Sequence, residues 1–389
     1  MNMMTFIRLT VILSITFIIF SCSQHDDIIE FPEDLPLYSI DPHLSELVSM
    51  DDILDDVAFI PLSLPNDIQL AVIQTMIFND DRIYALEMTT SGSNPRVFAF
   101  DSMGNFEYVI DRFGRGPGEY EYIYAIAVSD NYLILSTTTH IIFNHLSDGT
   151  YSHSIQNRFD DNWVQWIHFF DDTVGVTSAG RGRANRSMNH VKFFDTETQT
   201  FTQEEVPFPS HAVMFNASHR HLFETPEGLK VRPLNSNIVY SITQDSENFI
   251  VEPDYGLDFG DLWVPESFLR TSFRNMDEIF TEGIHEVYIY DADIFETEDI
   301  LYVSYRFEKE RRGYMFDKTT DSTKFITDFT DNSIGFPLLP MTTHNNHIVG
   351  LVYPFDLEEE PIHPELLEAI NQNEDGGHPI IIKAKFKID

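Results

Sequence analysis

Cysteine is nearly absent from this chain of 389 residues, since Cys22 is the only one. A single thiol cannot form a disulfide within the chain, so the fold must be held together by its apolar core. Basic residues are also scarce: 24 lysines and arginines stand against 63 aspartates and glutamates, a formal net charge of −39. A chain this negative repels phosphate groups, which argues against nucleic acid and anionic membrane surfaces as partners.

Motifs for well-known chemistries are missing as well. The sequence has no G-x-S-x-G elbow, no phosphate loop ending in Gly-Lys-Ser/Thr and no G-x-G-x-x-G fingerprint. The segment HEVYI at His285 lacks the second histidine of a zinc protease, and HNNH at His344–His347 is expected in a turn between strands. We therefore expect no metal and no cofactor.

A long apolar run occurs only at the N-terminus. Arg8 is followed by an almost wholly apolar stretch, Leu9–Phe20, which is too short to span a bilayer comfortably. The stretch leads into IFSC, so residues 1–21 are predicted to be a signal peptide and Cys22 the lipidated first residue of a lipoprotein. An ordinary secretory signal with an incidental cysteine is the alternative. Residues 22–52 are acidic and are predicted to form a tether.

A pattern of four strands recurs six times in residues 53–389. In each unit an apolar strand leads into a turn and then into further strands; the turns begin at Asp80, Ser129, Asp171, Pro226, Glu298 and Asn345. These positions are 49, 42, 55, 72 and 47 residues apart. Repeats of about 40–50 residues with four strands each are typical of β-propeller blades.

The two ends of the repeat array complement each other. The sixth unit lacks its last strand, whereas an unassigned strand, Val57–Ser63, precedes the first unit. Lending this strand to the last blade removes an exposed sheet edge. We therefore predict an all-β fold, a six-bladed β-propeller of four-stranded antiparallel blades that the N-terminal strand closes. An irregular pair of β-sandwiches is the alternative.

The stretch DRFGRGPGEY, residues 111–120, lies between the first two units. Its glycines Gly114, Gly116 and Gly118 can adopt positive φ, and Pro117 stiffens the middle. A compact crossover between blades is the favoured interpretation. A nest of backbone N–H groups that binds an anion is the alternative.

Four segments carry a resemblance to a known family: RFGRGPGEY, NSNIVYSI, DYGLDFGDLWVPE and HPIIIKAKF. With them the chain resembles the six-bladed β-propeller lipoproteins of the Bacteroidota, which are related to propellers of the NHL and TolB type. The resemblance implies a propeller fold and a location in the cell envelope. It implies no established reaction and no catalytic residues.

One face of the predicted propeller carries the links between blades and the loops between the second and third strands of each blade. We call this the loop face. Basic residues are concentrated in these segments. Two insertions also open there, Tyr255–His285 and Asp356–His378, with short helices expected near Pro265–Phe280 and within HPELLEAINQ. Long loops at one end of a rigid scaffold often bind ligands. The predicted ligand-binding residues are Arg112, Arg115, Tyr120, Arg158, Trp166, Arg181, Arg183, Arg270 and Arg311.

The sequence thus predicts a non-catalytic lipoprotein of the cell envelope, anchored at the outer membrane by its lipid alone. Its predicted partner is an anionic glycan, a peptide or an envelope protein, because arginine forks suit carboxylate and sulfate groups. Acidic residues share these loops, so pairing of the arginines within the protein is the alternative at that face. The alternative function is a hydrolase or lyase acting on glycans or esters at the channel mouth.

Overall fold

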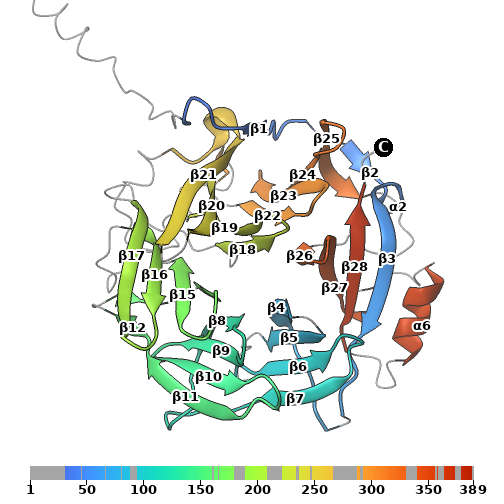
Figure 1. Ribbon diagram of the computed structural model, residues 1–389. Coiled ribbons are helices and arrows are strands. Elements are labelled where there is room, and N and C mark those ends of the chain that lie inside the picture. The colour runs from blue at the N-terminus through green and yellow to red at the C-terminus, as the bar shows by residue number, and fades with distance from the viewer. Residues whose placement is uncertain are drawn as a thin grey trace, which may run out of the picture.

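Six four-stranded antiparallel sheets stand in a ring around a central channel in the computed structural model of the chain (Figure 1). The first strand of each sheet lies nearest the channel and the fourth at the rim, so we label them A to D. The structure describes residues 31–387 apart from residues 45, 66, 80, 88–93, 160–161, 165, 179–188, 208–220, 234–235, 246–247, 266–286, 290–291, 330–339, 355–356, 358–362 and 373–377. The predicted six-bladed β-propeller is confirmed.

Blades 1 to 3 follow one another along the chain. Blade 1 consists of β4 (Ile73–Asn79), β5 (Arg82–Glu87), β6 (Val97–Asp101) and β7 (Phe106–Ile110). Blade 2 consists of β8 (Ile123–Val128), β9 (Tyr132–Thr137), β10 (His140–His145) and β11 (Tyr151–Gln156). A small hairpin links it to blade 3 and consists of β12 (Arg158–Phe159) and β13 (Asn162–Trp163). Blade 3 consists of β14 (Trp166–Phe169), β15 (Val174–Ser178), β16 (Asn189–Asp195) and β17 (Thr200–Pro207).

Blades 4 to 6 complete the ring. Blade 4 consists of β18 (Leu222–Thr225), β19 (Gly228–Val231), β20 (Ile238–Asp245) and β21 (Asn248–Asp258), which is followed by a 3-10 turn, η1 (Gly260–Leu262). Blade 5 consists of β22 (Ala292–Glu296), β23 (Ile300–Phe307), β24 (Glu310–Asp317) and β25 (Ser322–Phe329). Blade 6 consists of β26 (Pro340–His344), β27 (His347–Val352), β28 (Ile380–Phe386) and β3 (Leu54–Pro61).

The N-terminal strand β3 closes the ring as the D strand of blade 6. It pairs antiparallel with β28, with Ile60 opposite Ile381 and Phe59 opposite Ile382. The strand was expected over Val57–Ser63, and it begins three residues earlier, at Leu54. Pairing with β3 gives β28 a partner on its outer side, so the edge of β28 is not exposed to solvent. The predicted closure is confirmed.

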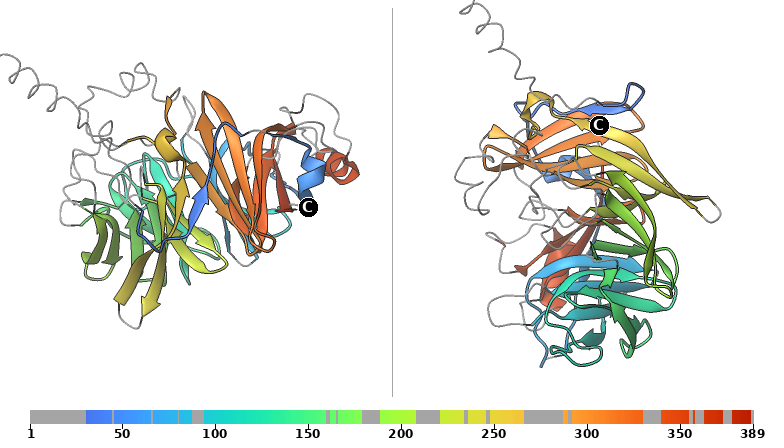
Figure 2. Two further views of the ribbon diagram at one scale, coloured as in Figure 1. Left: turned by 90° about the horizontal axis from the view of Figure 1, so that it is seen from above. Right: turned by 90° about the vertical axis from the view of Figure 1, so that its left-hand side faces the viewer.

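The chain before β3 is folded as well. The strands β1 (Leu37–Ser39) and β2 (Glu46–Val48) add in parallel to the D strands of blades 4 and 5, and α2 (Met50–Ile53) leads into β3 (Figure 2). The Tyr38 ring lies 4.9 Å from that of Phe316. Residues 22–52 were predicted to be a tether, whereas from Leu37 onward the chain packs against the rims of two blades. Two strands of three residues each are too short to stand out as strands in a sequence.

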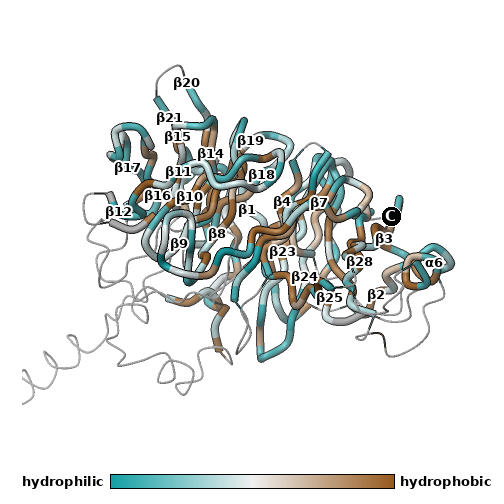
Figure 3. Tube along the Cα trace, turned by 90° about the horizontal axis from the view of Figure 1, so that it is seen from below, coloured by the Kyte–Doolittle hydropathy of each residue, from teal (hydrophilic) through white to brown (hydrophobic). Residues whose placement is uncertain are grey.

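Buried apolar clusters fill every junction between neighbouring blades. Six such clusters occur in the described part of the chain, and each joins side chains of two adjacent blades, including blades 6 and 1. In Figure 3 the middles of the strands are apolar and the turns between them hydrophilic. Since each blade buries both faces against its neighbours, the ring itself is the core of the protein.

One of the two expected helical insertions lies within the described residues. The helix α6 (Pro364–Gln372), predicted within HPELLEAINQ, packs beside β3 at the rim of blade 6 (Figure 1). Its Leu366 and Ala369 are buried in the apolar cluster between blades 5 and 6. The helix expected near Pro265–Phe280 falls almost entirely on residues that lie outside the described ranges.

Candidate functional site

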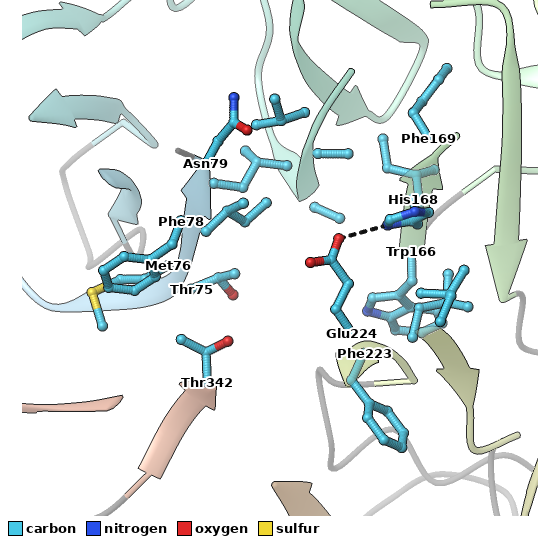
Figure 4. A pocket seen from close by; sticks show the side chains of 18 of the residues that line it. Thr75, Met76, Phe78, Asn79, Trp166, His168, Phe169, Phe223, Glu224 and Thr342 are labelled. Carbon is cyan, nitrogen blue, oxygen red and sulfur yellow. Dashed lines mark ion pairs between the residues drawn. The ribbon is translucent and has the colours of Figure 1, made fainter. Parts of the chain in front are cut away.

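The channel of the propeller contains a cavity of about 470 Å³. It is lined by the inner strands β4, β8, β14, β18 and β26, which belong to five different blades (Figure 4). The Thr343 hydroxyl of β26 donates to the Glu224 carbonyl of β18 at 3.5 Å, so blades 4 and 6 meet beside the channel. This volume falls within the range of about 300–1,000 Å³ that is usual for small-molecule sites.

Polar side chains gather at one end of this cavity. Each inner strand runs from the loop face to the turn between strands A and B, and we call the face of these turns the turn face. Asn79 and His344 end their strands, Glu224 is the next-to-last residue of β18, and Asp130 lies in the turn after β8. The polar end of the cavity is thus the end away from the predicted arginine face.

A histidine and a carboxylate meet inside the cavity. His168 Nδ1 on β14 lies 3.4 Å from Glu224 Oε1 on β18 (Figure 4). The Glu224 side chain is 73% exposed and that of His168 23% exposed. Burial lowers the pKa of His168, although the Glu224 charge acts in the opposite direction. A neutral imidazole protonated on Nδ1 can donate to this carboxylate and hold it in place.

A second histidine lines the opposite wall. The His344 ring stacks on that of Phe78 with 4.7 Å between the ring centroids. Burial, together with the nearby charges of Lys383 and His347, lowers the pKa of His344 to about 4. At neutral pH this imidazole is uncharged, so it offers hydrogen bonding and an apolar ring face but no positive charge.

Trp166 is the predicted site residue that lines the channel. It begins β14, is 9% exposed, and its ring lies 4.4 Å from that of His221. It was expected among the ligand-binding residues of the loop face. The structure places it in the channel wall on the same strand as His168.

The DRFGRGPGEY stretch folds into a compact link between blades 1 and 2. Gly114 N–H donates to the Tyr120 carbonyl at 3.1 Å, and Tyr120 N–H donates to the Arg112 carbonyl at 3.0 Å. Gly116 N–H donates to Glu119 Oε2 at 2.7 Å. A carboxylate of the loop itself therefore occupies the place that the alternative interpretation reserved for a bound anion.

The glycines of this link differ in their requirements. Gly118 has a φ of +75°, and a Cβ built on it would lie 2.5 Å from the Tyr151 ring. Gly116 does not adopt the positive φ that was expected, and a Cβ there would lie 3.0 Å from the end of the Glu119 side chain. Gly118 thus needs glycine for both conformation and space, and Gly114, with a φ of +156° and the Glu119 carboxylate where its Cβ would lie, is restricted as well.

Two residues predicted to bind ligand are used inside the protein. The Arg112 guanidinium donates to Asn144 Oδ1 and, at 3.2 Å, to the Gly149 carbonyl of the next blade. Burial lowers the pKa of Arg112. Tyr120 is 2% exposed, and its hydroxyl donates to the Ile110 carbonyl at 2.8 Å. Both side chains fasten the link, which leaves neither of them facing a ligand.

The remaining predicted arginines are scattered. Arg115 is 82% exposed and pairs with Glu121 at 2.8 Å. Arg158 is exposed on β12, and Arg311 is exposed on β24 opposite Arg306. Arg181, Arg183 and Arg270 lie outside the described residues, as does Cys22. Within the described part of the chain, these arginines do not converge on one cavity.

Sequence reasoning missed the residues that form the cavity. His168, Glu224 and His344 lie in inner strands, where apolar residues were expected to dominate. A charged or titratable residue within an otherwise apolar strand could have indicated the site, as His168 does in WIHF and Glu224 in LFET. The described residues bring no three His, Cys, Asp or Glu side chains together as a metal site. They also contain no helix with the length and apolar character needed to cross a bilayer.

A family model described as a domain of unknown function, DUF4934, matches residues 38–385. The chain belongs to this family. The match begins within β1, so the DUF4934 unit includes nearly all of the N-terminal segment that packs on blades 4 and 5. A search of the curated proteins finds no match to this DUF4934 chain.

Solved structures resemble this chain to different degrees. The crystal structure of a candidate exported protein from Bacteroides fragilis is similar over 90% of this chain and 100% of its own length, with a TM-score of 0.74 and 16% sequence identity. A candidate 6-phosphogluconolactonase from Bacteroides uniformis is similar over 77% of this chain and 89% of its own length, with a TM-score of 0.41 and 13% identity. The likeness to the exported protein, at 16% identity, concerns the fold and not the activity.

Proposed function

We propose that this DUF4934 protein is a lipid-anchored protein of the cell envelope that binds a small ligand in its channel without catalysing a reaction. The observation that carries the binding proposal is the cavity in the channel, where Glu224 on β18 and His168 on β14 meet and Trp166 lines the wall. A concave site with aromatic walls and a few placed polar groups is the usual form of a small-molecule site.

The envelope location is supported by the apolar run that leads into Cys22. The similar Bacteroides fragilis protein is described as exported, which agrees with this location. The test is Cys22→Ser followed by cell fractionation, because acylation requires the thiol. The variant should leave the membrane fraction, and a variant that still sediments with membranes would contradict the lipid anchor.

A steric block tests the binding site. The chain from Ser23 onward, which keeps every described residue, is first screened against glycans and small molecules. Thr342 lies in the channel wall (Figure 4), so Thr342→Trp should weaken binding of any ligand that occupies the cavity. Thr323→Trp makes the same change on the exposed D strand of blade 5 and should leave binding intact. Equal binding by both variants would place the ligand elsewhere.

A hydrolase is the second candidate, and the His168–Glu224 pair favours it, since an imidazole held by a carboxylate can serve as a general base. His168→Gln separates the two functions. A binding protein should keep its affinity for a ligand that does not contact the imidazole and should turn over no ester or glycoside. Turnover by the wild type that disappears in His168→Gln would favour the enzyme.

Binding of an anionic partner at the loop face is a separate prediction. The anionic glycan, peptide or protein partner would depend on arginines such as Arg181, Arg183 and Arg270, and such binding should weaken with added salt. An anionic ligand that is insensitive to Thr342→Trp and sensitive to salt would support that face.

A further inference from the structure

We propose that the channel ligand carries a protonated primary amine and that the Glu224 carboxylate binds it. This inference rests on the proposed function, because it assigns the chemical class of the ligand to the same cavity. It also differs from the sequence expectation, which favoured an anionic ligand at the opposite face.

The charges that face the cavity are acidic. Glu224 and Asp130 line it, and no lysine or arginine occurs among the described residues that do so. Among the described residues, His168 is the only side chain within ion-pair distance of the Glu224 carboxylate. The carboxylate is largely exposed to the cavity, so a second, cationic partner can reach it (Figure 4).

The two histidines do not neutralise this carboxylate at neutral pH. The pKa of His168 is lowered by burial, and that of His344 is lowered to about 4 by burial and by the Lys383 and His347 charges. His168 can hold the carboxylate with a hydrogen bond from its Nδ1–H, but the neutral imidazole adds no positive charge. Among the described residues that line the cavity, the groups charged at neutral pH are therefore the carboxylates of Glu224 and Asp130, while Lys383 acts on His344 from behind the wall.

The buried lysine on the strand next to β18 already has acidic partners. Lys230 lies on β19, next to β18, and is 3% exposed. Its ammonium group lies 2.9 Å from Glu227, 2.8 Å from Asp254 and 2.9 Å from Glu296, between blades 4 and 5. With three carboxylates around it, Lys230 does not serve as the counter-ion of Glu224.

The walls suit a cation that also bears hydrogen-bonding groups. Trp166, Tyr124 and Phe170 line the cavity, and aromatic faces attract ammonium groups. Thr75, Thr342 and Asn79 add neutral donors and acceptors, which favour a hydroxyl-bearing molecule such as an amino sugar. The formal charge of −39 on the whole chain draws cations toward the protein and repels anions.

The test compares two disaccharides with the same sugar skeleton, one with charged amines and one with neutral acetamides. The probes are the β-1,4-linked glucosamine disaccharide with free amines and its N-acetylated counterpart, titrated calorimetrically into the chain from Ser23 at about pH 6, where sugar amines are protonated. A third probe, 1,5-diaminopentane, shows whether the sugar skeleton is needed. Glu224→Gln removes the charge with little change in shape. Glu252→Gln makes the same change at an exposed position on β21 and is the control.

The amine disaccharide should bind wild type and Glu252→Gln about tenfold or more tightly than the acetylated one, the scale of one charge-assisted hydrogen bond. In Glu224→Gln this preference should disappear. Equal or tighter binding of the acetylated sugar, or a preference that survives Glu224→Gln, would overturn the inference. If only neutral ligands bind and Thr342→Trp blocks them, the amine class is wrong while the channel site stands. If amines bind but Thr342→Trp has no effect, the channel site itself is wrong.

Discussion

The two faces of the propeller use their polar residues in opposite ways. On the loop face, Arg112 and Tyr120 contact backbone carbonyls, and Glu119 binds the Gly116 N–H of its own link. At the turn face, Glu224 and His168 project from inner strands of two blades into an open cavity. The glycine- and arginine-rich link that stands out in the sequence thus holds blades 1 and 2 together. Single polar residues within the inner strands form the site.

Backbone geometry explains the difference. A link that crosses from the rim of one blade to the channel side of the next leaves many N–H and C=O groups without strand partners, and these must be satisfied when buried. Charged and glycine-rich residues supply such partners. Each inner strand is hydrogen-bonded to a neighbouring strand on one side only, and its other edge faces the channel. Its channel-side groups lie outside the links between blades, so they can contact a ligand.

Opening the ring should have the largest effect, because both faces depend on closure. A chain that begins at residue 65 lacks β3, which exposes the edge of β28 and uncovers the apolar cluster that contains Ile380 and Ile382. This variant should aggregate or lose cooperative melting. The control is the chain from Ser23, and equal melting temperatures for the two proteins would rule out closure by the N-terminal strand.

Gly118→Val should have the next largest effect. The substitution forces a branched side chain into a φ of +75° and against the Tyr151 ring, so we expect a loss of about 1–3 kcal/mol in the free energy of unfolding. Gly116→Val is the matched control and should cost less, since its closest neighbour is the movable end of Glu119. Chemical denaturation compares the two. A larger loss in Gly116→Val would contradict the assignment of the strained position.

Acid should weaken both faces through buried histidines. Burial and the neighbouring His221 lower the pKa of His190, near the loop face, to about 3; the pKa of His344, at the turn face, is lowered to about 4. An unfolded histidine titrates near pH 6.5. Below that pH the unfolded chain takes up protons that the folded chain does not, so stability is complete above pH 6.5 and falls toward each folded pKa.

Replacing these histidines should reveal which face is more sensitive. His190→Gln and His344→Gln should each flatten the loss of stability between about pH 6.5 and 4, because each removes a group whose folded pKa lies far below its unfolded value. Urea denaturation at a series of pH values measures the slopes. Identical slopes in both variants and the wild type would show that neither histidine carries the acid sensitivity.

Arg115→Ala should have the smallest effect. Its side chain is 82% exposed and its partner Glu121 is 46% exposed, and solvent screens such pairs strongly. The melting temperature and the affinity for a channel ligand should both stay unchanged. A marked drop in melting temperature would mean that the arginine, and not the glycines, supports the link.

Much of the fold could be predicted because it depends on local patterns. Apolar strands separated by turns at regular spacing indicate blades, and the missing last strand of the sixth unit points to β3. Strands β1 and β2 escaped prediction because three residues are too few to show a periodicity; they form through pairing with β21 and β25, which lie far away in the sequence.

The site could not be predicted to the same extent. His168 and Glu224 are 56 positions apart in the sequence, and their meeting depends on the rotation between blades. Nothing local to either residue indicates that it faces the channel. Trp166 was identified as a binding residue for its aromatic ring, yet its place in the channel wall follows only from the position of β14 in the ring.

The most direct test of the channel site is a hydrogen-exchange footprint of the bound ligand. The ligand found by screening is added to the chain from Ser23 at saturation, and the protection of backbone amides is compared with and without it. The channel site predicts slower exchange in β14, β18 and β26 and no change in residues 111–122. Protection of residues 111–122 with no change in those inner strands would contradict it and return the binding site to the loop face.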